Sequence, residues 1–445
     1  MTNADTCKRD PRAPLRQALR THGEFGAGQT AGRFYPIACV ALEITQRCNL
    51  DCTLCYLSDR AEMAKDVPLP VLASRIAMIA KRYGPGTSVQ ITGGDPTLRK
   101  VEHLEELCRL IRGHGMRSCL MTNGIKASRK MLARLAAAGL DDVAFHVDLT
   151  QERKGYDSEA ALNAIRRDYL DRAEGLGLRV LFNTTVFDGN LAELPALVRF
   201  FRGEAHRITL ISFQMQADTG RGVLGTRGDA ITQGSVARRI EEGMGTALDF
   251  GATAVGHSAC NRFAVALVAG KQAMPALGNR ALVHRLIAGL EEIEHQRDGY
   301  LDIARSLARL GLRRPRLALA ALAEAGRLAW HLRGGIWRGL VRGRPRVARL
   351  SVLIHNFMDA EALETARCES CVFMVATENG PLSMCAHNAE RDRHIFTPAR
   401  IETEAGTRWW HAETGEVTAA PAAPQPAEMP MKRLKGRLRA AARRD

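Results

Sequence analysis

The sequence has no uninterrupted apolar run of about 18 residues, the length that a membrane-spanning helix needs. Residues 1–29 also lack an apolar stretch before a small-residue cleavage site, so they do not have the pattern of a secretory signal. Together these absences predict a cytoplasmic protein without a spanning helix. Aromatic residues make up only 5% of the chain, and no stacking-rich basic motif is present, which argues against nucleic-acid binding.

Acidic residues are scarce in one stretch of a chain whose net charge is +15. Between Gly311 and Leu350 there are ten arginines, no lysine and a single acid, Glu324, with Trp330 and Trp337 among leucines and alanines. This composition is typical of a helix that lies on an anionic membrane or grips an anionic substrate. A nucleic-acid contact and a merely solvated basic face are the alternatives. We expect peripheral contact with the inner face of the membrane through 311–350.

Cysteine is the residue type with the most informative placement. The count of eleven is odd and the positions are clustered, which in a reducing compartment favours metal ligation over a disulfide framework. Cys48, Cys52 and Cys55 fall in the stretch EITQRCNLDCTLCYLS, with no fourth cysteine nearby. A cubane iron–sulfur cluster has four irons, so three thiolates leave one iron without a protein ligand. An open metal position is what a catalytic site needs, although three unrelated buried thiols or a zinc site completed from elsewhere are the alternatives.

The fold class follows from a repeated alternation of short apolar runs and longer stretches of helical period. Such alternation implies parallel strands joined by right-handed helical crossovers. Six units predict an α/β protein with a partial (βα)6 TIM-type barrel, in which the loops after the strands form the active-site mouth. The three-cysteine loop follows the first strand and is therefore expected at the mouth. The predicted strands are 37–45, 88–94, 117–124, 141–149, 178–187 and 207–216.

The rest of the chain predicts a modular arrangement around the barrel. Residues 264–350 have the pattern of helices broken by Gly and Pro, and a Pro/Ala linker near 417 leads into a basic segment expected to be disordered. The predicted parts are a mobile N-terminal arm (1–35), the barrel (36–255), a basic helical region inserted after it (256–350), a C-terminal cysteine-containing, auxiliary cluster-like segment (351–416) and a disordered tail (417–445).

Polar residues at the predicted strand ends indicate a ligand site. Gly93 and Gly94 would let backbone approach a ligand closely, and the carboxylate of Asp95, which precedes Pro96, can pair with an ammonium group. An ordinary turn is the alternative for this stretch. Further candidates at the strand ends are Asn123, His146, Asp148, Asn183, Thr185, Gln214 and Gln216.

The aromatic Tyr56 comes directly after the three spaced cysteines. Because of this residue, the cysteine spacing and the Gly93-Gly94-Asp95-Pro96 stretch, residues 36–255 resemble the radical S-adenosylmethionine (radical SAM) superfamily. The resemblance implies that a 4Fe–4S cluster on the triad holds S-adenosylmethionine at its open iron. It also implies a backbone contact of Tyr56 with adenine and an amino-group contact at the glycine stretch, where Asp95 replaces the usual Glu. Asp148 and Asn183 then become ribose or carboxylate contacts, with His146 as the alternative to Asp148 and with Asn123 and Gln214 as further cofactor-binding candidates.

The activity that the resemblance implies is reductive cleavage of S-adenosylmethionine. The reduced cluster donates one electron, and the resulting 5'-deoxyadenosyl radical removes a hydrogen atom from the substrate. An external electron donor of the flavodoxin or ferredoxin type is the implied partner.

A second group of cysteines lies outside the barrel. Cys368 and Cys371 form a C-x2-C pair, Cys385 follows, and Cys260 comes just after the sixth unit. Four thiols would complete a second, closed 4Fe–4S cluster, while a structural zinc site is the alternative. His257 or His387 could replace Cys260 in either site. Of the remaining cysteines besides Cys7, we expect Cys39, Cys108 and Cys119 to be buried apolar positions.

The second half of the chain narrows the resemblance. SFQMQADTGRG, GHSACN, HNFMDA and RCESCVFMVATENGPLSMCAHN are similar to the branch that contains tetraether lipid synthases and class D methyltransferases, although the N-terminal cysteine knuckle of that branch is absent. This similarity implies C–C bond formation or C-methylation on an unactivated carbon of a lipid or another long apolar substrate. A radical SAM peptide maturase with an auxiliary cluster, and a non-catalytic iron–sulfur or nucleic-acid-binding protein, are the competing hypotheses.

Overall fold

The computed structural model describes residues 10–291, 300–341, 347–404 and 406–421. Cys7 and most of the predicted tail lie outside these ranges. None of the helices within them combines the length and the apolarity that crossing a bilayer requires.

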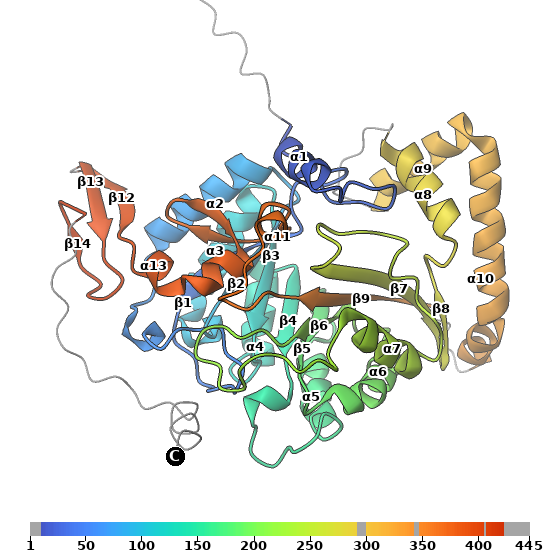
Figure 1. Cartoon of the computed structure of the whole chain (residues 1–445), viewed down its shortest axis with the longest axis horizontal. Coiled ribbons are helices and arrows are strands. Elements are labelled where there is room, and N and C mark those ends of the chain that lie inside the picture. Colours follow the sequence, from blue (N-terminus) through green and yellow to red (C-terminus); the bar gives the residue numbers. More distant parts are fainter. Residues whose placement is uncertain (1–9, 292–299, 342–346, 405, 422–445) are drawn as a thin grey trace, which may run out of the picture.

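The centre of the molecule is one eleven-stranded sheet in which the six predicted strands stand side by side in chain order (Figure 1). All neighbouring pairs among these six are parallel. The sheet does not close on itself, because β11 and β8 form its two edges. The predicted fold class, a partial parallel β/α barrel, is confirmed. The strands are β1 (Cys39–Thr45), β2 (Ser88–Gly93), β3 (Arg117–Thr122), β4 (Asp142–His146), β5 (Arg179–Val186) and β6 (Leu210–Met215).

A helix follows each of these strands, as the sequence predicts. Every residue of β1 is buried, as is usual where helices cover the faces of a parallel sheet. The covering helices are amphipathic: Leu72, Ile76 and Ile79 of α2 recur at helical spacing and are fully buried in the main core. The helices are α2 (Leu69–Tyr83), α3 (Val101–Gly113), α4 (Arg129–Ala138), α5 (Asn163–Ala173), α6 (Leu194–Gly203) and α7 (Gln233–Met244).

The prediction of helices alone between 264 and 350 is wrong at its beginning. Residues 261–275 form the antiparallel hairpin of β7 (Asn261–Ala269) and β8 (Gln272–Pro275). Ala264, Ala266 and Val268 are the buried side of β7, a period of two that a short run of small apolar residues does not distinguish from helix. The predicted helices do follow, as α8 (Arg280–Glu291), α9 (Tyr300–Arg313) and α10 (Pro315–Val341).

The predicted division treats the cysteine-containing segment after 350 as a separate part. In the structure this segment is not a separate body. Its first strand, β9 (Ala348–Asn356), pairs in parallel with β6 and antiparallel with β7. Its second strand, β10 (Phe373–Thr377), pairs in parallel with β1 at the other end of the six-strand series and leads into β11 (Gly380–Ser383). The segment therefore extends the barrel sheet on both sides. It also contributes α11 (Thr365–Glu369), α12 (Met384–Ala389), α13 (Arg391–Ile395) and the separate sheet of β12 (Ala399–Thr403), β13 (Gly406–Trp410) and β14 (Val417–Thr418).

The described part of the predicted N-terminal arm, residues 10–35, is packed against the protein. Helix α1 (Ala13–Thr21) buries Leu15 and Leu19, one helical turn apart, in a small core with Val372. Farther along, the fully buried amide of Gln29 donates to the carbonyl of Gly256 at 2.8 Å. The polar composition that indicates an arm misses this helix, because its apolar face is only two leucines wide.

Candidate active site

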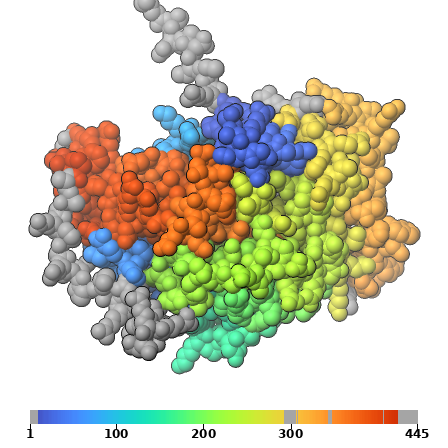
Figure 2. Space-filling model, in the orientation of Figure 1, coloured from blue at the N-terminus to red at the C-terminus, as the bar shows by residue number. Residues whose placement is uncertain are grey.

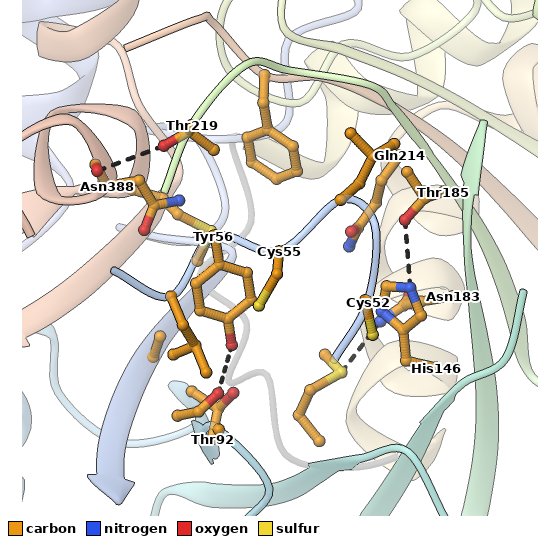
Figure 3. A pocket seen from close by; sticks show the side chains of 18 of the residues that line it. Cys52, Cys55, Tyr56, Thr92, His146, Asn183, Thr185, Gln214, Thr219 and Asn388 are labelled. Atoms are coloured by element: carbon orange, nitrogen blue, oxygen red, sulfur yellow. Dashed lines mark hydrogen bonds between the residues drawn. The ribbon is translucent and has the colours of Figure 1, made fainter. Parts of the chain in front are cut away.

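A cavity of about 220 Å³ lies at the carboxyl ends of the parallel strands. Its walls come from the ends of β1 to β6, from the loop after β1 and from α12 of the C-terminal segment. Figure 3 shows Cys52 and Cys55 between Tyr56 on one side and His146 with Asn183 on the other. The mouth of the barrel is therefore a shared site for both halves of the chain.

The three cysteines of the first motif all line this cavity. Their loop is held by backbone hydrogen bonds to two others: Thr53 N donates to Thr150 O at 2.8 Å, and Arg221 N donates to Cys55 O at 3.0 Å. Burial raises the pKa of the Cys48 thiol to about 11 and also raises that of Cys52, with the neighbouring thiols adding to both shifts. The loop thus presents three sulfurs to one space.

This donor set is compatible with a cluster. Among the described residues, no three His, Cys, Asp or Glu side chains are gathered as ligands of one metal ion. In a 4Fe–4S cluster each thiolate binds its own iron, so the thiols must border one cavity and need not converge on one point. Cys48, Cys52 and Cys55 meet that requirement.

Tyr56 is fixed from two sides. Its hydroxyl donates to Gly93 O at 2.6 Å, and the Arg391 guanidinium lies 4.7 Å from its ring centroid. Arg391 comes from α13 and also pairs with Glu43 of β1, so the C-terminal segment holds the triad loop in place. Burial opposes ionisation of Glu43, yet the Arg391 charge lowers the pKa of that carboxyl below its ordinary value. The sequence analysis missed both Glu43 and Arg391.

The glycine stretch is only partly brought to the cavity. Gly93 and Gly94 line it, but Asp95 and Pro96 do not. The Asp95 carboxylate is fully buried and accepts hydrogen bonds from Thr97 N and Asn123 N, both at 2.9 Å. It therefore ties the loops after β2 and β3 together, and the expected pairing of this carboxylate with a ligand ammonium group finds no support in its position.

Replacing Gly94 by Ala is expected to abolish S-adenosylmethionine binding. A Cβ there would lie 2.1 Å from the carbonyl oxygen of Arg47, so the backbone at the cavity wall must shift. Equilibrium dialysis with labelled S-adenosylmethionine would measure the loss. Gly113→Ala is the matched control, since a Cβ on that helical glycine meets nothing within 4 Å and should leave binding unchanged. Equal binding by both variants would contradict a close backbone approach at Gly94.

The polar residues on the other strands divide into two layers. His146, Asn183, Gln214 and Asn123 line the cavity. Asp148 lies behind them, fully buried, and accepts from His146 Nε2 at 2.6 Å and from Thr185 N at 2.7 Å. Of the two candidates on the fourth unit, the structure brings His146 to the cavity and gives Asp148 the task of orienting it.

This pair sets a pH dependence. Burial alone would lower the pKa of His146, but the Asp148 charge and hydrogen bond raise it above its ordinary 6.5. Burial alone would raise the pKa of Asp148, but His146 lowers it to about 2. Because the folded-state pKa of His146 is raised, the stability it contributes is complete below about pH 6.5 and is lost as the pH rises through the folded value. The stability that the lowered pKa of Asp148 contributes is lost only as the pH falls towards 2.

Asp148→Asn is therefore expected to lower the pKa of His146, as followed by an NMR titration of the imidazole carbons. Thr150→Val, which removes the hydroxyl that donates to the Asp148 carboxylate, is the control and should leave the pKa of His146 unchanged. An unchanged His146 titration in Asp148→Asn would show that the carboxylate does not hold the proton.

Other cavity residues were not predicted. They come from the loop after β6, the loop after β9 and α12, within stretches that carried the resemblance to the branch but were not predicted to line this cavity. Methionines in HNFMDA and PLSMCAHN were the available signal, because flexible Met side chains are common in apolar binding surfaces. These residues are Thr219, Phe357, Met358, Met384 and Asn388; Cys385, which was predicted for the second metal site, also lines the cavity.

One cysteine of the second group reaches the same cavity. Cys385 lines it, and burial raises the pKa of Cys385 to about 11, with the thiols of Cys260 and Cys368 adding to the effect. Burial also raises the pKa of Cys371, with contributions from Cys385 and Cys260. Cys260 Sγ accepts from Arg367 Nε at 3.2 Å. The remaining described cysteines, Cys39, Cys108 and Cys119, are buried as predicted.

Fold and site together define a β/α protein with a cysteine-lined cofactor pocket at the mouth of its strands. The family model of the radical SAM superfamily matches residues 42–201, which contain the triad, the glycine stretch, His146 and Asn183. Residues 42–201 are thus similar to the radical SAM domain.

Curated relatives share this part of the chain. An Fe-coproporphyrin III synthase of Methanosarcina barkeri is 31% identical over 189 residues, covering 41% of this chain and 45% of the relative. A 7,8-dihydro-6-hydroxymethylpterin dimethyltransferase of Methanocaldococcus jannaschii is 27% identical (40% and 36%), and a PqqA peptide cyclase of Methylobacterium nodulans is 30% identical (37% and 42%). The chain spans less than half the length of each of these relatives.

Solved structures give a weaker likeness. The structure of anSMEcpe with bound AdoMet has a TM-score of 0.36 at 16% identity, covering 46% of this chain and 59% of that one. Methylornithine synthase has a TM-score of 0.36 at 14% identity, covering 55% and 75%.

Proposed function

We propose that this chain is a radical SAM enzyme that reductively cleaves S-adenosylmethionine and functionalises an unactivated carbon of a lipid or another long apolar substrate, by C–C bond formation or C-methylation. The proposal places it in the tetraether lipid synthase and class D methyltransferase-like branch. The observation that carries it is the shared cavity, in which the three thiols and two glycines face a wall of methionine, leucine and phenylalanine. Apolar side chains beside a few polar groups suit an apolar substrate next to a polar cofactor.

Cys48, Cys52 and Cys55 would hold the 4Fe–4S cluster, which, when reduced by an external flavodoxin or ferredoxin, supplies the electron that splits S-adenosylmethionine into methionine and a 5'-deoxyadenosyl radical. Gly93 and Gly94 give the cofactor close contact with backbone. His146, oriented by Asp148, offers its imidazole to a polar group of the cofactor, while Asn183 and Gln214 offer amides to hydroxyls. The apolar wall excludes water from the reacting carbon.

Cys260, Cys368, Cys371 and Cys385 are proposed to hold a second 4Fe–4S cluster, with zinc as the alternative. The C-x2-C spacing of Cys368 and Cys371 and the position of Cys385 at the cavity wall support this proposal. Because Cys385 borders the cavity, a group bound there would adjoin the substrate, which favours a role in electron transfer or substrate binding over a purely structural one.

The test is anaerobic reconstitution with iron and sulfide, followed by dithionite and S-adenosylmethionine. Formation of 5'-deoxyadenosine supports the enzyme, and its absence in a fully loaded protein favours a non-catalytic iron–sulfur protein. Adding a total lipid extract in deuterated form should then transfer deuterium to 5'-deoxyadenosine. If no deuterium is transferred from lipid, the proposed substrate is wrong, while the proposed cleavage of S-adenosylmethionine still stands.

A peptide maturase is the second candidate. The 30% identity to a PqqA peptide cyclase over 170 residues favours it, and an auxiliary cluster beside the cavity would serve it as well. Deuterium transfer from a short precursor peptide encoded next to this gene, and none from lipid, would decide for it.

A further inference from the structure

Helix α10 has two apolar faces, and the protein covers only one of them. Leu317, Leu328, Leu332 and Gly335 are buried on the inner face. Gly335 lies so close to the end of β7 that a Cβ would stand 2.1 Å from Ala269 O. This face explains why the helix is anchored on the hairpin of β7 and β8.

The outer face carries a second row, which we call the apolar stripe. Its residues recur at intervals of three, eight, seven and three, so they share one side of the helix, opposite the inner face. Their exposed fractions lie between 52 and 68%. At ~1.5 Å per residue the row is ~30 Å long. The stripe consists of Leu319, Leu322, Trp330, Trp337 and Leu340.

The surroundings of the stripe are basic. Residues 300–341 contain eight arginines and two acids. Arg333 lies within the stripe with its guanidinium 4.1 Å from the Trp330 ring centroid. The acid of α10, Glu324, is paired with Arg327 at 2.6 Å and is shielded from solvent. An anionic partner would therefore meet no unpaired negative charge on this helix.

Position in the molecule adds to the argument. α10 forms the outer edge beyond β8, on the side opposite the sheet of β12 to β14, and its surface runs along that edge (Figures 1 and 2). An exposed row of large apolar side chains on a convex edge is uncommon in a monomer and marks a contact surface.

We propose that the apolar stripe is a docking surface for an anionic lipid bilayer, with α10 lying in the plane of the headgroups. Trp and Leu enter the boundary between headgroups and acyl chains, and arginines beside them reach the phosphates. A second copy of the chain fits less well, because pairing two such helices would bring arginines together with only Glu324 as counter-charge. The inference names a lipid bilayer as the partner of the proposed enzyme. The purpose of the contact, access to a lipid substrate, rests on the proposed function, but the binding itself does not.

Flotation of the full chain with vesicles tests the surface. Vesicles of phosphatidylcholine with phosphatidylglycerol should carry the protein at about 0.15 M salt, with weaker binding to phosphatidylcholine alone, because the charge attraction acts within a Debye length of the surface. Trp330→Ser with Trp337→Ser should weaken partition at least about tenfold, as expected when two interfacial anchors are lost. Leu363→Ser with Val417→Ser is the matched control: both residues are exposed and apolar but lie elsewhere, and binding should persist.

Tryptophan emission gives a second readout that does not depend on yield. Emission should shift to the blue with anionic vesicles, and Trp330→Phe with Trp337→Phe should lose that shift while still floating. No flotation of the unaltered protein overturns the proposal, as does equal flotation of the serine variant. Dimerisation without vesicles that the serine variant abolishes also overturns it, and assigns the stripe to a second copy. Vesicle binding needs neither cluster nor S-adenosylmethionine, so its failure is separable from failure to form 5'-deoxyadenosine.

Discussion

Replacing Cys48, Cys52 and Cys55 together by alanine is expected to abolish 5'-deoxyadenosine formation. The three thiols are the sulfurs that the loop after β1 presents to the cavity, and without them the proposed cluster has no ligands at the barrel mouth. Iron in the reconstituted protein should fall from about eight to about four atoms per chain if the second cysteine group also holds a cubane cluster. Iron analysis and the EPR spectrum of the reduced protein measure the loss directly.

The control is Cys108→Ala with Cys119→Ala, which removes two thiols that are buried in the core on α3 and β3. This variant should keep its iron and its activity. If the triad variant keeps the same iron content and spectrum as the unaltered protein, the proposed cluster site is wrong.

Arg166→Met is expected to destabilise the protein by about 3–5 kcal/mol, the usual cost of leaving a buried charge without its partner. Arg166 of α5 is fully buried and pairs with Glu159, which is also fully buried. It also donates to Val147 O at 2.8 Å and to Glu159 O at 2.7 Å, so it closes the segment that follows β4 and carries Asp148. Burial lowers the pKa of Arg166 and raises that of Glu159, so each charge depends on the other.

Denaturant unfolding of the apoprotein would measure this effect. Arg167→Met is the matched control one position along the helix, where the side chain is 59% exposed and its ion pair with Glu204 spans 3.7 Å. A surface pair of this kind contributes about 0–1 kcal/mol. Equal stabilities of the two variants would mean that the buried pair does not hold the segment after β4. Adding Glu159→Gln to Arg166→Met should recover part of the loss, since the orphaned charge is then removed.

Local patterns were sufficient for the barrel strands and for the triad. Each of the six strands is a short apolar run bounded by a helix of clear period, and the ligand types and spacing of the cysteine motif lie within eight residues of chain. The same reasoning failed for residues 261–275, where small apolar residues fit either period, and for α1, where Leu15 and Leu19 alone face the core.

Other features depended on long-range pairing, which local patterns do not specify. The placement of β9 beside β6 and of β10 beside β1 joins residues far apart in the chain. That pairing brings Cys385 and Met384 to the cavity and sets Arg391 against Tyr56. The hydrogen bond from Thr185 N of β5 holds Asp148 behind His146, which faces the cavity, a choice that the period of two alone leaves open.

The sequence by itself determined the class of fold, the three-thiol loop and the basic, Trp-containing helix. Each of these features depends on contiguous residues, and their chemistry and period are enough to predict it. Only the tertiary structure decided which side chains share the cavity and which face of α10 stays uncovered. The reason is that burial and contact are set by neighbours brought together in space, and a strand that adds to either edge of the sheet leaves no local mark of where it will pair.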